Sequence, residues 1–202
     1  MIGSIQRRRG VRALGVLSIV AVLAVLAAVV TGFAHRGHGV KADAKKASAA
    51  LEAGLQAQTQ GDLDVAAARY REVLKYDSRN KFAIYDLALI DASQQNYGLA
   101  EDKYRQVLAI DGSYEPALFN LAIMEKAKGN TDAAIALYER ATAAAPKDAA
   151  AHMNLGILLR STGKVAAGDA EVKEAISLNP KLVDPAAAAG TKSSVASPTA
   201  TP

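Results

Sequence analysis

The sequence predicts an all-α protein in which four pairs of helices stack as a repeat array behind one membrane-spanning helix. The first observation is a period of 34 residues in the apolar positions of residues 47–182. The second is a run of 22 uncharged, mostly apolar residues at 13–34. A fixed period of this length is typical of stacked supersecondary units, none of which can bury its apolar face alone.

Residues 13–34 form the first predicted element, a transmembrane helix. At about 1.5 Å per residue, this run reaches across a hydrocarbon core of about 30 Å. A cleaved signal peptide is the alternative, because Gly32 and Ala34 would suit a cleavage site, but the apolar run is longer than signals usually have. Its length also disfavours a buried helix of a globular domain. We therefore predict an uncleaved signal anchor.

The charges that flank this run predict its orientation. Residues 1–12 contain four arginines, whereas Arg36 is the only fixed positive charge in the first six residues beyond the run. Because positively charged flanks stay in the cytoplasm, we expect residues 1–12 to be a basic cytoplasmic terminus. The chain would then be a single-pass protein of the cell membrane, with its repeats on the extracytoplasmic side. Three lysines within residues 35–46, a predicted polar linker, reduce this asymmetry.

The four predicted repeats cover residues 47–80, 81–114, 115–148 and 149–182. Each contains two helices with a period of 3.6 residues. The apolar series that marks the second helices is Tyr70, Tyr104, Tyr138 and Val172. The series that marks the first helices is Ala53, Leu87, Leu121 and Leu155. A small residue follows each member of the first-helix series and lets neighbouring helices approach closely.

This pattern resembles the tetratricopeptide repeat, which has small, aromatic, glycine and proline residues at fixed places. The second repeat departs from the pattern, with Gln95 and Asn96 at its turn. The matching turn and closing residues are Gly61, Gly129, Gly163, Pro146 and Pro180. The resemblance implies a right-handed superhelical solenoid of four helix pairs. Together with the predicted span, it suggests a membrane-anchored protein of bacterial type.

Residues 183–202 are predicted to be a disordered tail. They are rich in Ala, Ser, Thr and Pro and offer too few large apolar side chains to offset the entropy lost on ordering. At the end of the array, we expect Leu182 and Val183 to fold back over Val172 and Ile176 and cover the last helix.

The distribution of charge argues against a nucleic-acid partner. The whole chain is basic, with an isoelectric point near 9.2, but residues 47–182 contain 15 Lys and Arg against 18 Asp and Glu. A domain that neutralises phosphates needs a basic face. The basic residues instead flank the predicted span, where topology and anionic head groups explain them.

Few residues of the chain are suited to catalysis. There is no cysteine and there are only three histidines. His35 and His38 are three residues apart, but neighbouring glycines argue against a fixed helix, so we favour head-group contacts over a metal site. His152 falls at a helix-packing position. Acidic pairs such as Glu101 and Asp102 begin second helices, where the helix dipole explains them. We expect no enzyme activity, no cofactor and no metal.

The first helices carry the predicted binding residues. In proteins of the resembled family, the exposed side of these helices lines the concave surface of the superhelix. The residues that we expect to line this groove are Leu51, Tyr85, Asp86, Phe119, Asn120, Met153 and Asn154. Aromatic and methionine side chains are typical anchors for a partner, and an asparagine can pair with a peptide unit. Packing within the array and simple surface polarity are the competing interpretations of these positions.

One helical turn further along the same face lies a second apolar series. Its members are Leu55, Leu89, Ile123 and Ile157. The sequence leaves open whether they pack in the core or extend the apolar stripe. The function that we predict is a non-enzymatic scaffold that binds a protein or peptide segment in the groove. The alternative is a structural or self-associating component of a membrane complex.

Overall fold

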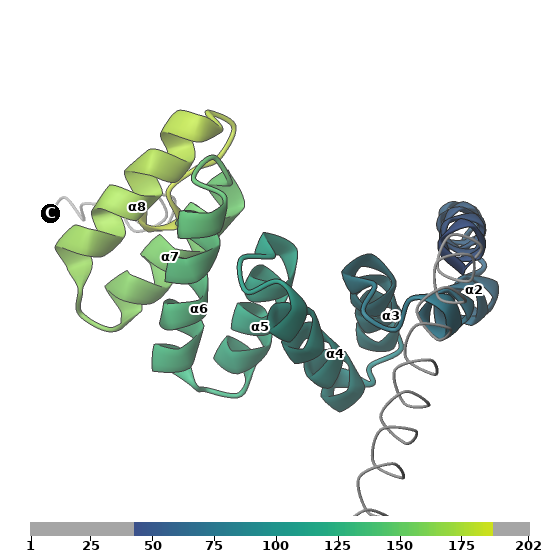
Figure 1. Cartoon of the computed structure of the whole chain (residues 1–202). Coiled ribbons are helices and arrows are strands. Elements are labelled where there is room, and N and C mark those ends of the chain that lie inside the picture. The colour runs from purple at the N-terminus through teal and green to yellow at the C-terminus, as the bar shows by residue number, and fades with distance from the viewer. Residues whose placement is uncertain (1–42, 188–202) are drawn as a thin grey trace, which may run out of the picture.

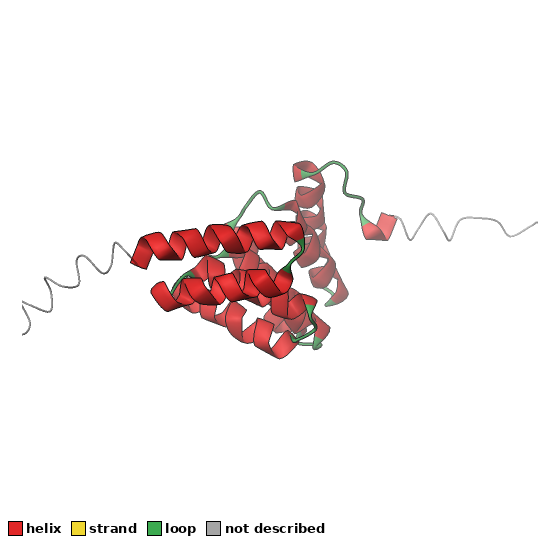
Figure 2. Ribbon diagram, turned by 90° about the vertical axis from the view of Figure 1, so that its right-hand side faces the viewer, coloured by secondary structure: helices red, strands yellow, loops and turns green. Residues whose placement is uncertain are grey.

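A computed structural model describes residues 43–187, which form helices and turns without a strand (Figures 1 and 2). A helix over residues 43–60 comes first. The helices that follow are α2 (Leu63–Tyr76), α3 (Lys81–Ser93), α4 (Tyr97–Ile110), α5 (Glu115–Ala127), α6 (Thr131–Ala144), α7 (Ala149–Ser161) and α8 (Val165–Leu178). The predicted basic terminus and transmembrane helix, and most of the predicted linker and tail, lie outside the described residues. Within 43–187, no helix is both long and apolar enough to cross a membrane.

The described helices follow one another in chain order as a row of antiparallel pairs (Figure 1). The closest packing is within the pairs α3 with α4, α5 with α6, and α7 with α8. Successive pairs are joined by contacts of α2 with α3, α4 with α5, and α6 with α7. The all-helical fold of repeated helix pairs is therefore confirmed.

The turns between the two helices of each repeat share one geometry. Gly61, Gly129 and Gly163 have φ values of +84°, +83° and +82°, and Gln95 has a φ of +63° at the same place in the second repeat. The N–H groups of Asp62, Asn96, Asn130 and Lys164 donate to carbonyls five residues earlier, at 2.9, 2.9, 2.9 and 3.0 Å. The second repeat thus keeps the turn without glycine, at a cost of about 1–2 kcal/mol for the left-handed backbone.

The core is built around the tyrosines of the second helices. Tyr70, Tyr104 and Tyr138 are at most 1% exposed, and Val172 is 2% exposed. Small residues at the helix crossings make room for these rings. Among them are Ala66, Ala88, Ala100, Ala122 and Ala134, each 0% exposed.

The last helix pair has the closest backbone approach. A Cβ added at Gly156 of α7 would lie 2.7 Å from the Gly168 carbonyl oxygen and 2.7 Å from Val172 Cγ2. A Cβ added at Gly168 would lie 2.6 Å from the Gly156 carbonyl oxygen. The two glycines therefore allow α7 and α8 to touch through their backbones.

The end of the array is covered partly as the sequence predicts. Leu182 packs against the cluster that contains Val172 and Ala175. Val183 is 67% exposed, so its expected packing role is wrong. An ion pair takes that place, because the Arg160 guanidinium of α7 donates to both Asp184 carboxylate oxygens at 2.6 and 3.0 Å. The first residues of the predicted tail are thus bound to α7.

We predict that Gly156→Ala destabilises the array by about 1–3 kcal/mol, because the added methyl forces α7 and α8 apart. Gly98→Ala in α4 is the matched control, since a Cβ there meets nothing within 4 Å. The control should be neutral or slightly stabilising. Denaturant unfolding of the full-length chain, followed by far-UV circular dichroism, measures both. Equal effects of the two substitutions would contradict the close approach.

Candidate functional site

The first-helix face is the side of the helix at 43–60, α3, α5 and α7 that carries the predicted groove residues. Tyr85, Asp86, Phe119, Asn120 and Asn154 are all partly exposed. Leu51 is also partly buried, against the cluster that contains Tyr70.

Tyr85 lies at the centre of an aromatic cluster. Its ring centroid is 5.8 Å from that of Tyr104 and 5.3 Å from that of Tyr114, and Tyr114 contacts Phe82 at 6.1 Å. The last two contacts are edge-to-face, which is a favoured arrangement of aromatic rings. The core tyrosine of α4 therefore supports a partly exposed aromatic surface on α3.

Phe119 has the equivalent place in the next repeat. Its ring lies 5.6 Å from that of Tyr138, at an interplanar angle of 74°. Each of these groove residues thus rests on the core tyrosine of its own repeat. A side chain held in this way loses little entropy when a ligand covers it, which favours binding.

Met153 does not belong to this exposed surface, and the expectation that it is exposed is wrong. It is only 9% exposed and packs with Val172 and Ala175. In the last repeat, Val172 takes the place of the core tyrosine and is smaller. The flexible methionine side chain fills the space that a tyrosine ring would occupy.

The two asparagines have fewer free donors than we expected. Asn120 Nδ2 donates to the Tyr85 hydroxyl at 3.0 Å and to the Pro116 carbonyl at 2.8 Å. Asn154 Nδ2 donates to the Ala150 carbonyl at 2.9 Å. The Asn120 amide therefore joins α5 to α3 and keeps its oxygen as the acceptor that a ligand N–H would use.

Asp86 is a half-buried carboxyl beside the aromatic cluster. Burial raises the pKa of the Asp86 carboxyl to about 6, and a hydrogen bond from the Tyr70 hydroxyl opposes that rise. The same hydroxyl lies 2.5 Å from Gln58 Oε1. The described residues contain no ion pair to Asp86 within 4.0 Å.

Sequence reasoning missed Tyr114 and Glu115 as members of the first-helix face. Burial and the neighbouring Asp148 raise the pKa of the Glu115 carboxyl. Burial raises the pKa of the Tyr114 hydroxyl, and the charges of Asp86, Asp111 and Glu115 add to that rise. Glu115 precedes Phe119 by four residues, and this helical spacing is the signal that could have found it.

The apolar series Leu55, Leu89, Ile123 and Ile157 is more exposed than the apolar groove positions that precede it by four residues, Leu51, Tyr85, Phe119 and Met153. Leu55 is 46% exposed and Ile123 is 43% exposed, whereas Leu89 and Ile157 are partly buried. Leu55 and Ile123 therefore extend the apolar surface beyond the aromatic cluster. This series therefore lies partly on the exposed first-helix face.

Outside this face, His152 and Glu101 have structural partners. His152 Nδ1 lies 2.6 Å from Glu171 Oε2, and His152 Nε2 lies 3.1 Å from the Pro146 carbonyl. Glu101 pairs with Arg105 at 2.6 Å and with Lys128. No three His, Cys, Asp or Glu side chains within 43–187 gather as metal ligands.

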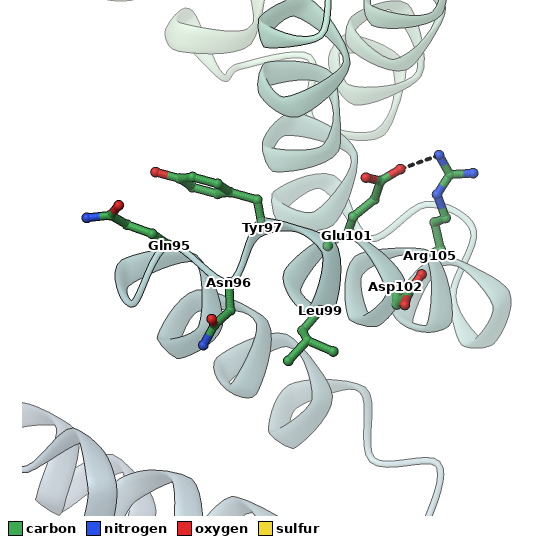
Figure 3. Close-up of a pocket in the computed structure, with 8 residues that line it drawn as sticks. Gln95, Asn96, Tyr97, Leu99, Glu101, Asp102 and Arg105 are labelled. Carbon is green, nitrogen blue, oxygen red and sulfur yellow. Dashed lines mark hydrogen bonds and ion pairs between the residues drawn. The ribbon is translucent and has the colours of Figure 1, made fainter.

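A hollow of about 710 Å³ lies at the start of α4 (Figure 3). Tyr97 and Leu99 border it and are more than half exposed, but their side chains point in different directions (Figure 3). Its Glu101 and Arg105 are already paired. The hollow therefore lacks the converging polar groups that an active site requires.

The comparison with protein families identifies the class of this protein. The family model described as Tetratricopeptide repeat matches residues 43–115 and 119–181, which is more than half of the chain. The chain belongs to the tetratricopeptide repeat family. This fold is typically a non-catalytic scaffold for protein–protein interactions. A comparison with curated proteins finds no match.

Solved structures of tetratricopeptide repeat proteins share the fold. The structure described as MamA is 21% identical, with a TM-score of 0.59, and the match covers 70% of this chain and 83% of that one. PilF of Pseudomonas aeruginosa is 21% identical, with a TM-score of 0.60, and the match covers 70% and 64%. The O-GlcNAc transferase of Thermobaculum terrenum is 28% identical, with a TM-score of 0.52, but the match covers 58% of this chain and only 22% of the enzyme.

The pKa of Asp86 predicts a pH dependence of stability. Because its folded pKa of about 6 exceeds the ordinary 3.8, the folded state binds more protons between these values. Its contribution to stability is therefore full below about pH 4 and is lost as the pH rises through about 6. Asp86→Asn is neutral at every pH, so it should become more stable relative to the parent chain between pH 4 and 7.

Unfolding free energies of the full-length chain at pH 4.5 and pH 7 measure this difference. Asp64→Asn, at an exposed position of α2, is the control and should give a smaller change with pH. An Asp86→Asn difference that is the same at both pH values would contradict the assigned burial of the carboxylate.

Proposed function

We propose that this protein is a non-enzymatic scaffold at a membrane and that it binds an extended or helical segment of a partner protein in a groove on the first-helix face. The observation that carries the proposal is the partly exposed aromatic surface of Tyr85, Tyr114 and Phe119, held by contacts with core tyrosines or with one another. Aromatic anchors of this kind dominate the binding energy of many interfaces.

The chemistry of this face suits a peptide ligand. Apolar side chains at Leu55 and Ile123 lie beyond the aromatic cluster, and polar groups at Asp86 and Asn120 lie beside it. A groove with anchors and a few polar groups can fix both the position and the direction of a bound chain. A contact area of about 1,000 Å² with a flexible ligand implies an affinity on the micromolar scale.

The membrane location rests on the sequence. The uncharged run at 13–34 has the length of a membrane span, and the arginines of residues 1–12 favour a cytoplasmic amino terminus. In this arrangement, the repeats of a bacterial protein face the extracytoplasmic side. The array then presents its first-helix face to other proteins at the membrane surface.

A photo-reactive amino acid at position 123 tests the proposal in native membranes. Ile123 is exposed on the same face as Phe119, one helical turn further along, so the change should leave the core intact. Position 139, which is exposed on α6 away from the tyrosine core, is the matched control. We expect a discrete cross-linked protein from position 123 and not from position 139.

Three other outcomes bear on the proposal. Cross-links from position 139 alone would contradict groove binding. A cross-link from position 123 to a second copy of the chain would support the self-associating alternative. Recovery of the full-length chain in the soluble fraction would overturn the membrane location.

A further inference from the structure

The first-helix face contains acidic groups that lack cationic partners. Asp86 directly follows Tyr85 and Glu115 directly follows Tyr114, and the centroids of these two rings lie 5.3 Å apart. Within residues 43–187, neither carboxyl has an ion pair with a Lys, Arg or His side chain. Lys81, the lysine of this cluster, is bound to Asp111 at 2.5 Å. The two carboxyls are partly buried, which makes an uncompensated negative charge costly.

The aromatic rings beside these carboxyls already attract a cation. The Lys81 ammonium lies 5.2 Å from the centroid of Phe82 and 5.1 Å from that of Tyr114. Ring faces attract cations through their quadrupole, and the attraction is larger where water is excluded. Tyr85 makes the second edge contact with Tyr114, so the three rings form one aromatic cluster. Asp86 and Glu115 lie next to this cluster in the chain, and the neighbour of Glu115 is another carboxyl, Asp148, so neither has a cation beside it among the described residues.

We propose that this surface binds a lysine or arginine side chain of the partner segment, with the cation between Asp86 and Glu115 and against the rings of Tyr85 and Tyr114. The inference rests on the proposed function and adds the charge of the ligand to it. The occupant is an extended segment of another protein that carries at least one basic residue. An approaching cation would compensate the charge that burial makes costly, so recognition and desolvation act together.

The charge balance favours this occupant over an acidic segment. Residues 47–182 carry 18 acidic and 15 basic side chains, so the array is mildly negative. The positions corresponding to Asp86 in the other repeats carry Glu52, Asn120 and Asn154, and none of them is basic. A terminal or side-chain carboxylate would meet repulsion from Asp86, and the lysine of the cluster, Lys81, is already paired with Asp111.

A displayed library of random 12-residue peptides, selected on the immobilised full-length chain, tests the inference. The test variant is Asp86→Asn with Glu115→Gln. It should fold, because the third and fourth repeats already have asparagine at the place of Asp86. The matched control is Asp64→Asn with Glu174→Gln, which removes two exposed carboxylates of the same types elsewhere. Unfolding midpoints of both variants check that the array is intact.

We expect the selected peptides to contain Lys or Arg. Fluorescence anisotropy should show that the test variant binds them about tenfold or more weakly, because charged hydrogen bonds to the basic side chain are lost. The control variant should bind within about twofold of the parent chain. Replacing the basic residue of the peptide by glutamine should cause the same loss for the parent chain and little further loss for the test variant.

Two results would overturn the inference. Equal weakening by the test and control variants would show diffuse attraction to an acidic protein. Peptides without a basic residue, whose binding depends on Tyr85 and Phe119 but not on Asp86, would show that the groove binds partners without this cation site. The second result would still support the proposed function. Selected peptides whose binding depends on none of Asp86, Glu115, Tyr85 and Phe119 would contradict both the inference and the proposed function.

Discussion

The structure depends on one packing interaction that is repeated along the array. A tyrosine on each of the first three second helices is buried at the centre of its repeat, and its ring fills the space left by small residues where the helices cross. The same ring supports a side chain on the first helix, as Tyr104 supports Tyr85 and Tyr138 supports Phe119. Stability and the shape of the first-helix face therefore have the same origin.

This arrangement explains why charged groups become buried on the first-helix face. Packing of Tyr85 and Tyr114 brings α3 close to the start of α5, and the Asn120 amide joins the two helices. Asp86 and Glu115 then lie beside the rings, with reduced access to water. The features on which the proposed cation site is based therefore follow from the core packing.

The sequence period predicts the helices and the buried tyrosines because each repeat has the same local solution. It does not predict burial where neighbouring elements differ. Met153 is buried because Val172 is smaller than tyrosine. Arg160 of α7 pairs with Asp184 because the chain that follows α8 turns back over α7. Helical spacing places Glu115 on the same side of α5 as Phe119, but its burial beside Asp148 comes from the neighbouring repeat. Such relations depend on distances between helices, which the spacing of residues along the chain does not encode.

A double-mutant cycle between Phe119 and Tyr138 tests most directly whether the core tyrosines hold the side chains of the first-helix face. The unfolding free energies of Phe119→Leu, Tyr138→Leu and the double variant would be measured in the full-length chain. The account predicts a coupling energy of about 0.5–1.5 kcal/mol, as expected for an edge-to-face pair. Tyr97→Leu with Tyr138→Leu, where Tyr97 is 58% exposed in the second repeat, should be additive. Additive effects of Phe119→Leu and Tyr138→Leu would contradict the account.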